Sequence, residues 1–288
     1  MAHLAYAIAT EKEINVASVP HRSPFRYPGG KTWLVPYARL WLGRRPRKIR
    51  ELIEPFAGGA IVGMTAAFEG LVDRVTLVEL DPDVSSVWET ILEGEGKRLA
   101  SKILTFVPTP STVKPVLEAE PRSRFDRAFA TIVRNRVQRG GILAPGAGMM
   151  KKGENGRGLA SRWYPETLCR RILDIVAIKD RIRFIPGDGL EYVRKNIHKS
   201  TAAFFVDPPY TVAGRRLYRY SEVDHKALFS LLNRSDGDFL MTYDDSSEIR
   251  RLTVEFRFDC ETVAMKNTHN ASMTELLVSK NLGWLRLH

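Results

Sequence analysis

The sequence predicts an α/β fold: a doubly wound, mostly parallel sheet of the Rossmann type with an inserted, mostly helical domain. Short apolar runs alternate with helical stretches on both sides of the insertion, which is typical of strands and crossover helices. Glycine-containing turns or acidic residues follow several of the predicted strands. From about residue 93 to 171 the alternation stops and the pattern becomes helical.

Composition limits the protein class. The 288 residues suffice for one large domain or a domain with an insertion, and 44% hydrophobic with 27% charged residues is ordinary for a soluble protein. The net charge of +11 favours a polyanionic partner. Cys169 and Cys260 form no metal-ligand pattern and no disulfide framework, so we expect a reducing, cytoplasmic setting. No apolar run approaches the roughly 20 residues of a membrane span, and Met1 to Ala9 lacks the basic start of a signal peptide.

The first motif follows an N-terminal tail, residues 1–24, that has no clear period. Gly29-Gly30-Lys31-Thr32 suggests a triphosphate-binding loop, but Phe25 stands where that loop requires its first glycine. The turn can still open a helix whose N-terminus binds an anion, with Lys31 meeting a carboxylate or phosphate. A plain helix-opening turn is the alternative.

A predicted strand at 49–53 leads into Glu54-Pro55-Phe56-Ala57-Gly58-Gly59-Ala60, and a helix then runs to about residue 68. Strand, glycine turn and helix form a nucleotide-binding unit, although Ala60 breaks the dinucleotide fingerprint. A cofactor without phosphates suits this loop better. The next strand, 74–78, ends at Glu79, about 20 residues beyond the turn, where an acid binds ribose hydroxyls. An adenosine-containing cofactor is therefore expected.

The predicted insertion, residues 93–171, lies between two parts of a catalytic domain, 25–92 and 172–288. Helices are expected at 84–106 and 125–138, with three prolines between them. Arginines with Asn and Gln follow at 134–139, and a glycine-rich loop runs from 140 to 158. Such side chains read base edges, so DNA contact is favoured over a solvated helix followed by a loop. The DNA-binding candidates that precede the second catalytic part are Arg26, Arg136, Gln138 and Arg139.

The α/β pattern resumes with a helix at 165–178 and a strand at 181–185. Asp188 in the following Gly187-Asp188-Gly189 can bond a cofactor adenine, cap the helix that starts at Leu190, or do both. A helix at 224–233, a strand at 239–243, a helix at 246–252 and an antiparallel pair at 254–263 and 274–279 complete the sheet. Asp244-Asp245 has no evident third ligand, so we expect a cap and loop rather than a metal site.

The apolar strand 202–206 leads into Asp207-Pro208-Pro209-Tyr210. The Asp207 carboxylate and the Pro208 carbonyl can each accept one N–H of an aromatic amine and turn its nitrogen toward a reactive geometry. Tyr210 offers a face on which a nucleobase can stack. An ordinary strand-ending turn is the alternative for the tetrad taken alone. Beyond it, tyrosines alternate with further DNA-binding candidates, Arg215, Arg216 and Arg219, in a loop suited to close on a nucleic-acid strand.

These blocks together resemble the Dam-type DNA adenine methyltransferases, the α-group of amino methyltransferases. The segments 25–31, 54–59 and 207–210 are similar, in the family's order, to its N-terminal donor motif, donor loop and catalytic tetrad; 135–142 resembles its recognition segment. The resemblance implies a Rossmann-like methyltransferase fold, S-adenosylmethionine as donor without a metal, and methylation of N6 on a flipped adenine in duplex DNA. It implies donor contacts from Tyr27, Lys31, Glu79 and Asp207, with Gly30, Phe56, Gly58 and Asp188 lining the site.

Two departures and two rivals accompany this hypothesis. Glu79 stands where aspartate is usual in the family, and the recognition segment departs freely, so the target sequence stays open. Rival functions are methylation of RNA or of cytosine N4, and a silent DNA-binding regulator with the same fold. Duplex DNA is the expected partner, a cognate restriction nuclease is a further candidate, no membrane is expected, and a monomer or weak dimer bound to the nucleoid is anticipated.

Overall fold

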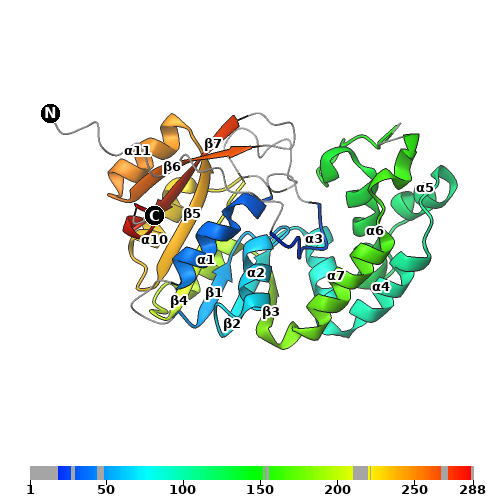
Figure 1. Ribbon diagram of the computed structural model, residues 1–288, viewed down its shortest axis with the longest axis horizontal. Coiled ribbons are helices and arrows are strands. Elements are labelled where there is room, and N and C mark those ends of the chain that lie inside the picture. Colours follow the sequence, from blue (N-terminus) through cyan, green and yellow to red (C-terminus); the bar gives the residue numbers. More distant parts are fainter. Residues whose placement is uncertain are drawn as a thin grey trace.

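A seven-stranded sheet forms the centre of one half of the molecule (Figure 1). The computed structural model describes residues 19–26, 30–43, 49–151, 153, 156–209, 220, 222–266 and 272–286. The strands lie in the order β3-β2-β1-β4-β5-β7-β6. Their bounds are β1 (Glu51–Glu54), β2 (Arg74–Glu79), β3 (Ile182–Pro186), β4 (Ala202–Val206), β5 (Asp238–Asp244), β6 (Asp259–Lys266) and β7 (Ser272–Ser279).

Strand direction identifies the fold. Strands β1 to β5 pair in parallel, whereas β7 runs antiparallel to both β5 and β6. This extends the Rossmann order 3-2-1-4-5 by one antiparallel insertion at the edge. The arrangement is that of the S-adenosylmethionine-dependent methyltransferase fold, and the predicted fold class is confirmed. Strand order reverses between β1 and β4, so a crevice is expected at the carboxyl ends of these two strands.

The end of the sheet differs from the prediction in one element. A strand was expected from residue 254, but α11 (Ser247–Glu255) extends through that position and Val254 is exposed on it. Phe256 caps the helix, and Arg257 then adopts a left-handed conformation with φ of 54°. The strand therefore begins only at Asp259.

Two helical layers enclose the sheet because its central strands are apolar on both faces. In β4, Ala203 and Phe205 join a hydrophobic cluster with α1 (Val35–Gly43), α2 (Ile61–Glu69) and α12 (Gly283–Arg286). Phe204 and Val206 join a second cluster with α8 (Gly189–Asn196), α10 (His225–Asn233) and α11. A strand buried on both faces reads as a continuous apolar run, which is why 202–206 was recognisable in the sequence.

A block of helices occupies the other half of the molecule, between β2 and β3 (Figure 1). It comprises α3 (Pro82–Thr90), α4 (Gly96–Thr105), α5 (Pro110–Glu118), α6 (Arg124–Val137) and α7 (Pro165–Ala177). The helix expected at 84–106 is interrupted at Ile91–Glu95, where Gly94 has φ of 108°. Helix α5 was not predicted, because its prolines suggested a connection; Pro110 instead occupies the first turn, where a missing N–H costs nothing.

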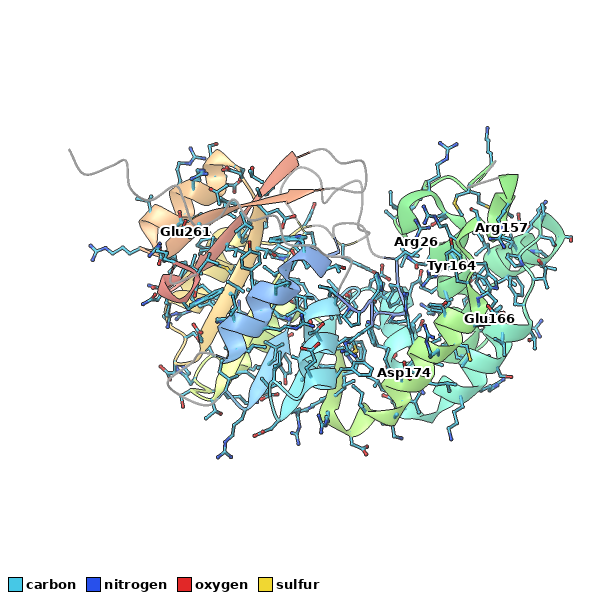
Figure 2. The ribbon with its side chains drawn as sticks, in the orientation of Figure 1. Arg26, Arg157, Tyr164, Glu166, Asp174 and Glu261 are labelled. Carbon is cyan, nitrogen blue, oxygen red and sulfur yellow. The ribbon has the colours of Figure 1, made fainter. Side chains whose placement is uncertain are left out.

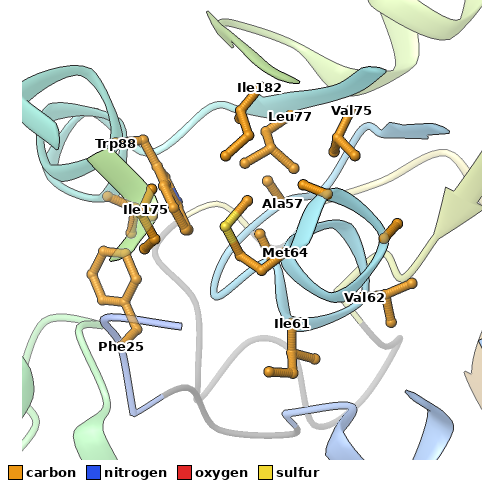
Figure 3. Packing of buried hydrophobic residues seen from close by; sticks show 14 of the residues in the cluster. Phe25, Ala57, Ile61, Val62, Met64, Val75, Leu77, Trp88, Ile175 and Ile182 are labelled. Atoms are coloured by element: carbon orange, nitrogen blue, oxygen red, sulfur yellow. The ribbon is translucent and has the colours of Figure 1, made fainter. Parts of the chain in front are cut away.

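The helical block and the sheet share one hydrophobic core. The cluster that contains Leu77 of β2 also contains Trp88, Ile132 and Ile175 of the block. Figure 3 shows Trp88 and Ile175 beside Phe25, which lies in the first sequence motif, with Met64 of α2 nearby. The predicted domain boundaries stay predictions. Among the described helices, none combines the length and apolar character that crossing a membrane requires.

Candidate active site

A cavity opens at the carboxyl ends of the parallel strands, where the strand order reverses. Every described member of the predicted donor-binding set lines it: Gly30, Lys31, Phe56, Gly58, Glu79, Asp188 and Asp207. Pro209 of the tetrad lines the same cavity. Segments that are up to about 180 residues apart in the chain therefore meet at one site. Binding of a cofactor there remains a prediction.

The glycine loop between β1 and α2 forms the floor of this cavity. Gly58 and Ala60 both adopt left-handed conformations, with φ of 45° and 49°, and Ala60 caps α2 in this state. A left-handed alanine is strained, so surrounding contacts must hold it. Trp88 of α3 supplies one such contact, donating from Nε1 to the Gly58 carbonyl over 3.0 Å. Its ring packs against Phe25 with centroids 6.0 Å apart, which joins the loop to the N-terminal motif.

Glu79 ends β2 with its carboxylate turned toward the glycine loop. Oε2 accepts from the Gly58 amide over 2.8 Å, and Oε1 accepts from the Asp81 amide over 2.9 Å. Burial raises the pKa of Glu79 to about 7, although these two amides oppose the rise. Each carboxylate oxygen can accept more than one hydrogen bond, so capacity for ribose hydroxyls remains. The predicted role fits the position but is not tested by it.

Asp188 forms the helix cap that was one of its two predicted roles, and its contact with a cofactor adenine stays a prediction. It caps α8, accepting from the Glu191 amide over 3.0 Å, and it lines the cavity. The neighbouring Gly189 is required by close packing, because a Cβ there would lie 1.9 Å from the Pro55 carbonyl oxygen. The turn after β3 therefore packs directly against the loop after β1.

Asp207 is held by side chains from two other segments. Lys31 Nζ lies 3.0 Å from Oδ1 of Asp207, and the Thr242 hydroxyl donates to the same oxygen over 2.8 Å. Lys31 Nζ also lies 3.5 Å from Glu275 Oε2. Burial lowers the pKa of Lys31, but the carboxylates of Asp207 and Glu275 outweigh this and leave the pKa raised. Lys31 meets a carboxylate, as one reading of its motif predicted.

Glu54 is a site residue that sequence reasoning placed in the loop but assigned no role. It is 3% exposed, and its Oε2 accepts from the Gly63 amide over 2.8 Å. Burial raises the pKa of Glu54 well above its usual range; the Gly63 amide opposes this and the charge of Asp207 adds to it. An acid directly after a buried strand was the available signal. Thr242 and Glu275 lie within strands and carried no comparable signal.

The predicted DNA-reading residues are placed differently from expectation. Asn135 is fully buried and clamps Arg26, accepting from its amide over 2.9 Å and donating to its carbonyl over 2.8 Å. Arg136 is 3% exposed and donates to the Pro24 carbonyl over 2.6 Å. Burial, with the charges of Arg171 and Arg26, lowers the pKa of Arg136 to about 9. In this structure the Arg136 side chain anchors the segment that precedes the first motif, and its assignment to DNA contact stays a prediction.

The other DNA-binding candidates also remain untested. Gln138 is half-buried and donates to the Ala147 carbonyl over 3.2 Å, whereas Arg139 is exposed. Arg26 is half-buried and lies near Tyr164 at one end of the helical block (Figure 2). The described residues do not include three of the DNA-binding candidates, Arg215, Arg216 and Arg219. They also do not include Tyr27 of the donor-binding set or Tyr210 of the tetrad. Within the described part of the chain, no group of His, Cys, Asp and Glu could hold a metal ion.

Comparison of the sequence with protein-family models and with curated proteins gives no match. Among solved structures, the chain is similar to the rRNA methyltransferase aviRa of Streptomyces viridochromogenes, with a TM-score of 0.40, 14% identity and 98% of each chain covered. A putative RNA methyltransferase of Pyrococcus horikoshii gives a TM-score of 0.39 and 10% identity, over 88% of this chain and 84% of that one. At such values the likeness says nothing about activity, and assignment of the fold rests on the sheet order.

Proposed function

We propose that the protein is a DNA adenine methyltransferase that uses S-adenosylmethionine to methylate the exocyclic N6 of adenine. The observation that carries this proposal is the position of Asp207. It ends β4 at the point where strand order reverses, in the wall of the cavity that also contains the glycine loop and Glu79. The two acids to which the proposal gives the amine and the ribose thus line one cavity.

The residues of the cavity fit an adenosine-containing donor. Glu79 offers carboxylate oxygens beside a glycine loop whose left-handed turn brings backbone close to the cavity. Asp188 is exposed at the cavity wall and can accept from an adenine amino group. Lys31 contributes one positive charge against the two carboxylates of Asp207 and Glu275.

Catalysis in this site would consist of orientation. S-adenosylmethionine supplies a methyl group already activated on a positively charged sulfur. The Asp207 carboxylate accepts one N–H of the target amine, and the Pro208 carbonyl accepts the other. The nitrogen would thereby be directed at the methyl carbon of the donor, so that formation of the N–C bond would accompany breakage of the S–C bond and the proton of the nitrogen would pass to bulk water. An adenine must leave the duplex to reach this position, which costs about a few kcal/mol.

Duplex DNA as the substrate is supported by charge and by architecture. The chain carries a net charge of +11, which favours a polyanion. The helical block between β2 and β3 lies beside the cavity, because its Gly141, Leu143 and Ala144 line the same cavity as Asp207. A nucleic acid that delivers a base to this cavity would meet the block.

The test is transfer of labelled methyl groups to unmethylated duplex DNA, with RNA in parallel, followed by digestion to nucleosides. Label in N6-methyladenine from DNA is the expected result. Label only in RNA or in cytosine would support methyl transfer but refute adenine in DNA as the substrate. No label in any acceptor, with donor binding intact, would favour a DNA-binding regulator with this fold.

A further inference from the structure

Glu275 lies outside every sequence motif, yet its carboxylate reaches the acid of the tetrad through a single lysine. It sits on β7, the antiparallel strand, in register with Asp244 of β5. Its side chain is 7% exposed, and that of Lys31 is 4% exposed. The buried ammonium thus bridges the carboxylates of Glu275 and Asp207, which belong to different strands, at 3.5 and 3.0 Å.

The contacts of Asp207 are concentrated on one of its two oxygens. In the part of the chain that the structure describes, Lys31 and Thr242 both bind Oδ1. The Asp207 side chain is 22% exposed and lines the cavity. Oδ2 is therefore the oxygen left to accept an N–H from the target amine. The orientation of the carboxylate depends on the two groups that hold Oδ1.

Lys31 can perform this task only if its own position is fixed. A lysine side chain has four methylenes and three rotatable donors, so one counterion leaves the ammonium free to move around it. A second counterion on a separate strand restricts the ammonium to the line between the two carboxylates. Glu275 is that second counterion.

We propose that Glu275 is a positioning residue, which holds Lys31 so that Lys31 and Thr242 fix Oδ1 of Asp207 and leave Oδ2 for the amine. This inference rests on the proposed methyl transfer, because it assigns a role within that reaction. Glu275 itself touches neither donor nor acceptor. We therefore expect its effect on turnover to pass through Lys31.

A double-mutant cycle tests this route. Glu275→Gln keeps the shape and removes the charge, and we expect kcat to fall about 10- to 100-fold, as for a misplaced catalytic group, with donor affinity within about twofold of wild type. In the K31M background the same substitution should leave kcat unchanged, because the lysine through which the proposal routes the effect of Glu275 is absent. Additive losses would overturn the proposal, as would wild-type kcat in the single variant.

Glu261→Gln is the matched control, because it removes a carboxylate on the adjacent strand β6 whose partner is Arg286 at the surface. We expect no change in its kcat. A parallel loss of donor affinity and kcat in Glu275→Gln, absent from the control, would indicate a structural role and overturn the proposal. If Glu275→Gln does not fold, Glu275→Asp retains the charge at a longer distance, and wild-type kcat in that variant would count against the proposal.

A second readout requires no substrate. Carbon NMR of the lysine side chains, with Lys31 assigned by K31M, follows the titration of its ammonium. We expect Glu275→Gln to lower the midpoint by at least about one pH unit, since an opposite charge within 4 to 6 Å favours the charged form. An unchanged midpoint would overturn the link between the two residues. If the wild type methylates no acceptor, the proposed function fails and the positioning role fails with it, whereas the NMR shift still reports whether the link exists.

Discussion

Raising the pH through 7 should strengthen binding of an adenosine-containing ligand, because Glu79 has a pKa of about 7. Ribose hydroxyls donate hydrogen bonds, and they donate more strongly to a carboxylate than to a neutral acid. With this pKa, Glu79 is about 10% ionised at pH 6 and about 90% ionised at pH 8. If the ligand requires the charged form, its dissociation constant should fall about 10-fold between these two values.

The assay is titration calorimetry with 5′-methylthioadenosine, which carries the ribose hydroxyls but no amino-acid part. His21, which also lines the cavity, does not titrate in this window, because burial lowers its pKa to about 4. Glu54 also lines the cavity and has a raised pKa, so the decisive comparison is Glu79→Gln. That variant should bind more weakly at pH 8 and lose the pH dependence. An affinity independent of pH in the wild type, or an equal slope in the variant, would refute the reasoning.

Stability of the ligand-free protein should change in the opposite direction. Between pH 4.5 and 7, Glu79 loses its proton in the unfolded chain but keeps it in the folded one. Because its pKa is higher in the folded state, Glu79 stabilises the folded protein fully below this interval. This contribution to the free energy of unfolding is lost as the pH rises through the interval. The difference of about 2.5 pH units corresponds to roughly 3 kcal/mol. Urea unfolding across this range should show a steeper loss of stability in the wild type than in Glu79→Gln, which keeps only the contribution of Glu54 and its raised pKa.

Three further substitutions test the cavity and its supports. Asp207→Ala should abolish methyl transfer while nucleic-acid binding persists, and turnover in a labelled-methyl assay would contradict its catalytic role. Gly189→Ala should destabilise the protein by about 3 kcal/mol in thermal unfolding, because the added Cβ would overlap the backbone of Pro55. The control Gly43→Ala has open space around its Cβ and should stabilise the protein by up to about 1 kcal/mol. Asn135→Leu leaves buried backbone groups unpaired and should lower the free energy of unfolding by about 3 kcal/mol. The control Arg139→Ala changes an exposed residue and should lower it by less than about 0.5 kcal/mol. Equal effects of the two substitutions would argue against the clamp.

The sequence predicted the sheet well because each central strand is short, apolar and followed by a turn or an acid. The strand 202–206 was recognisable because both of its faces are buried. The acids at strand ends could be assigned to one site because parallel strands bring their carboxyl ends to one edge of the sheet. Glu79 and Asp207 thus share a cavity although 128 positions separate them in the chain.

What the sequence could not predict depends on contacts between distant segments. Helix α5 was missed because Pro110 and Pro115 suggest a connection, whereas a capping box at Thr109 and packing against other helices stabilise this helix of nine residues. Glu275 follows Thr274 and precedes an apolar run within its strand, so no motif marks it, and only the pairing of β7 with β5 brings it to Lys31. Arg136 shares its residue type with DNA-reading arginines, and its burial could not be predicted from the sequence.

The clamp at Asn135 connects the helical block to the cavity. Its side chain pairs with both backbone groups of Arg26 and also donates to the Gly141 carbonyl over 2.8 Å. Gly141 has φ of 74°, and a Cβ on it would lie 2.4 Å from the Arg26 carbonyl oxygen, so the two segments are in direct contact. Both segments border the cavity, through Phe25 on one side and Gly141 on the other. The helical block therefore meets the cavity wall through three hydrogen bonds of one buried side chain and through the close approach of Gly141 to Arg26.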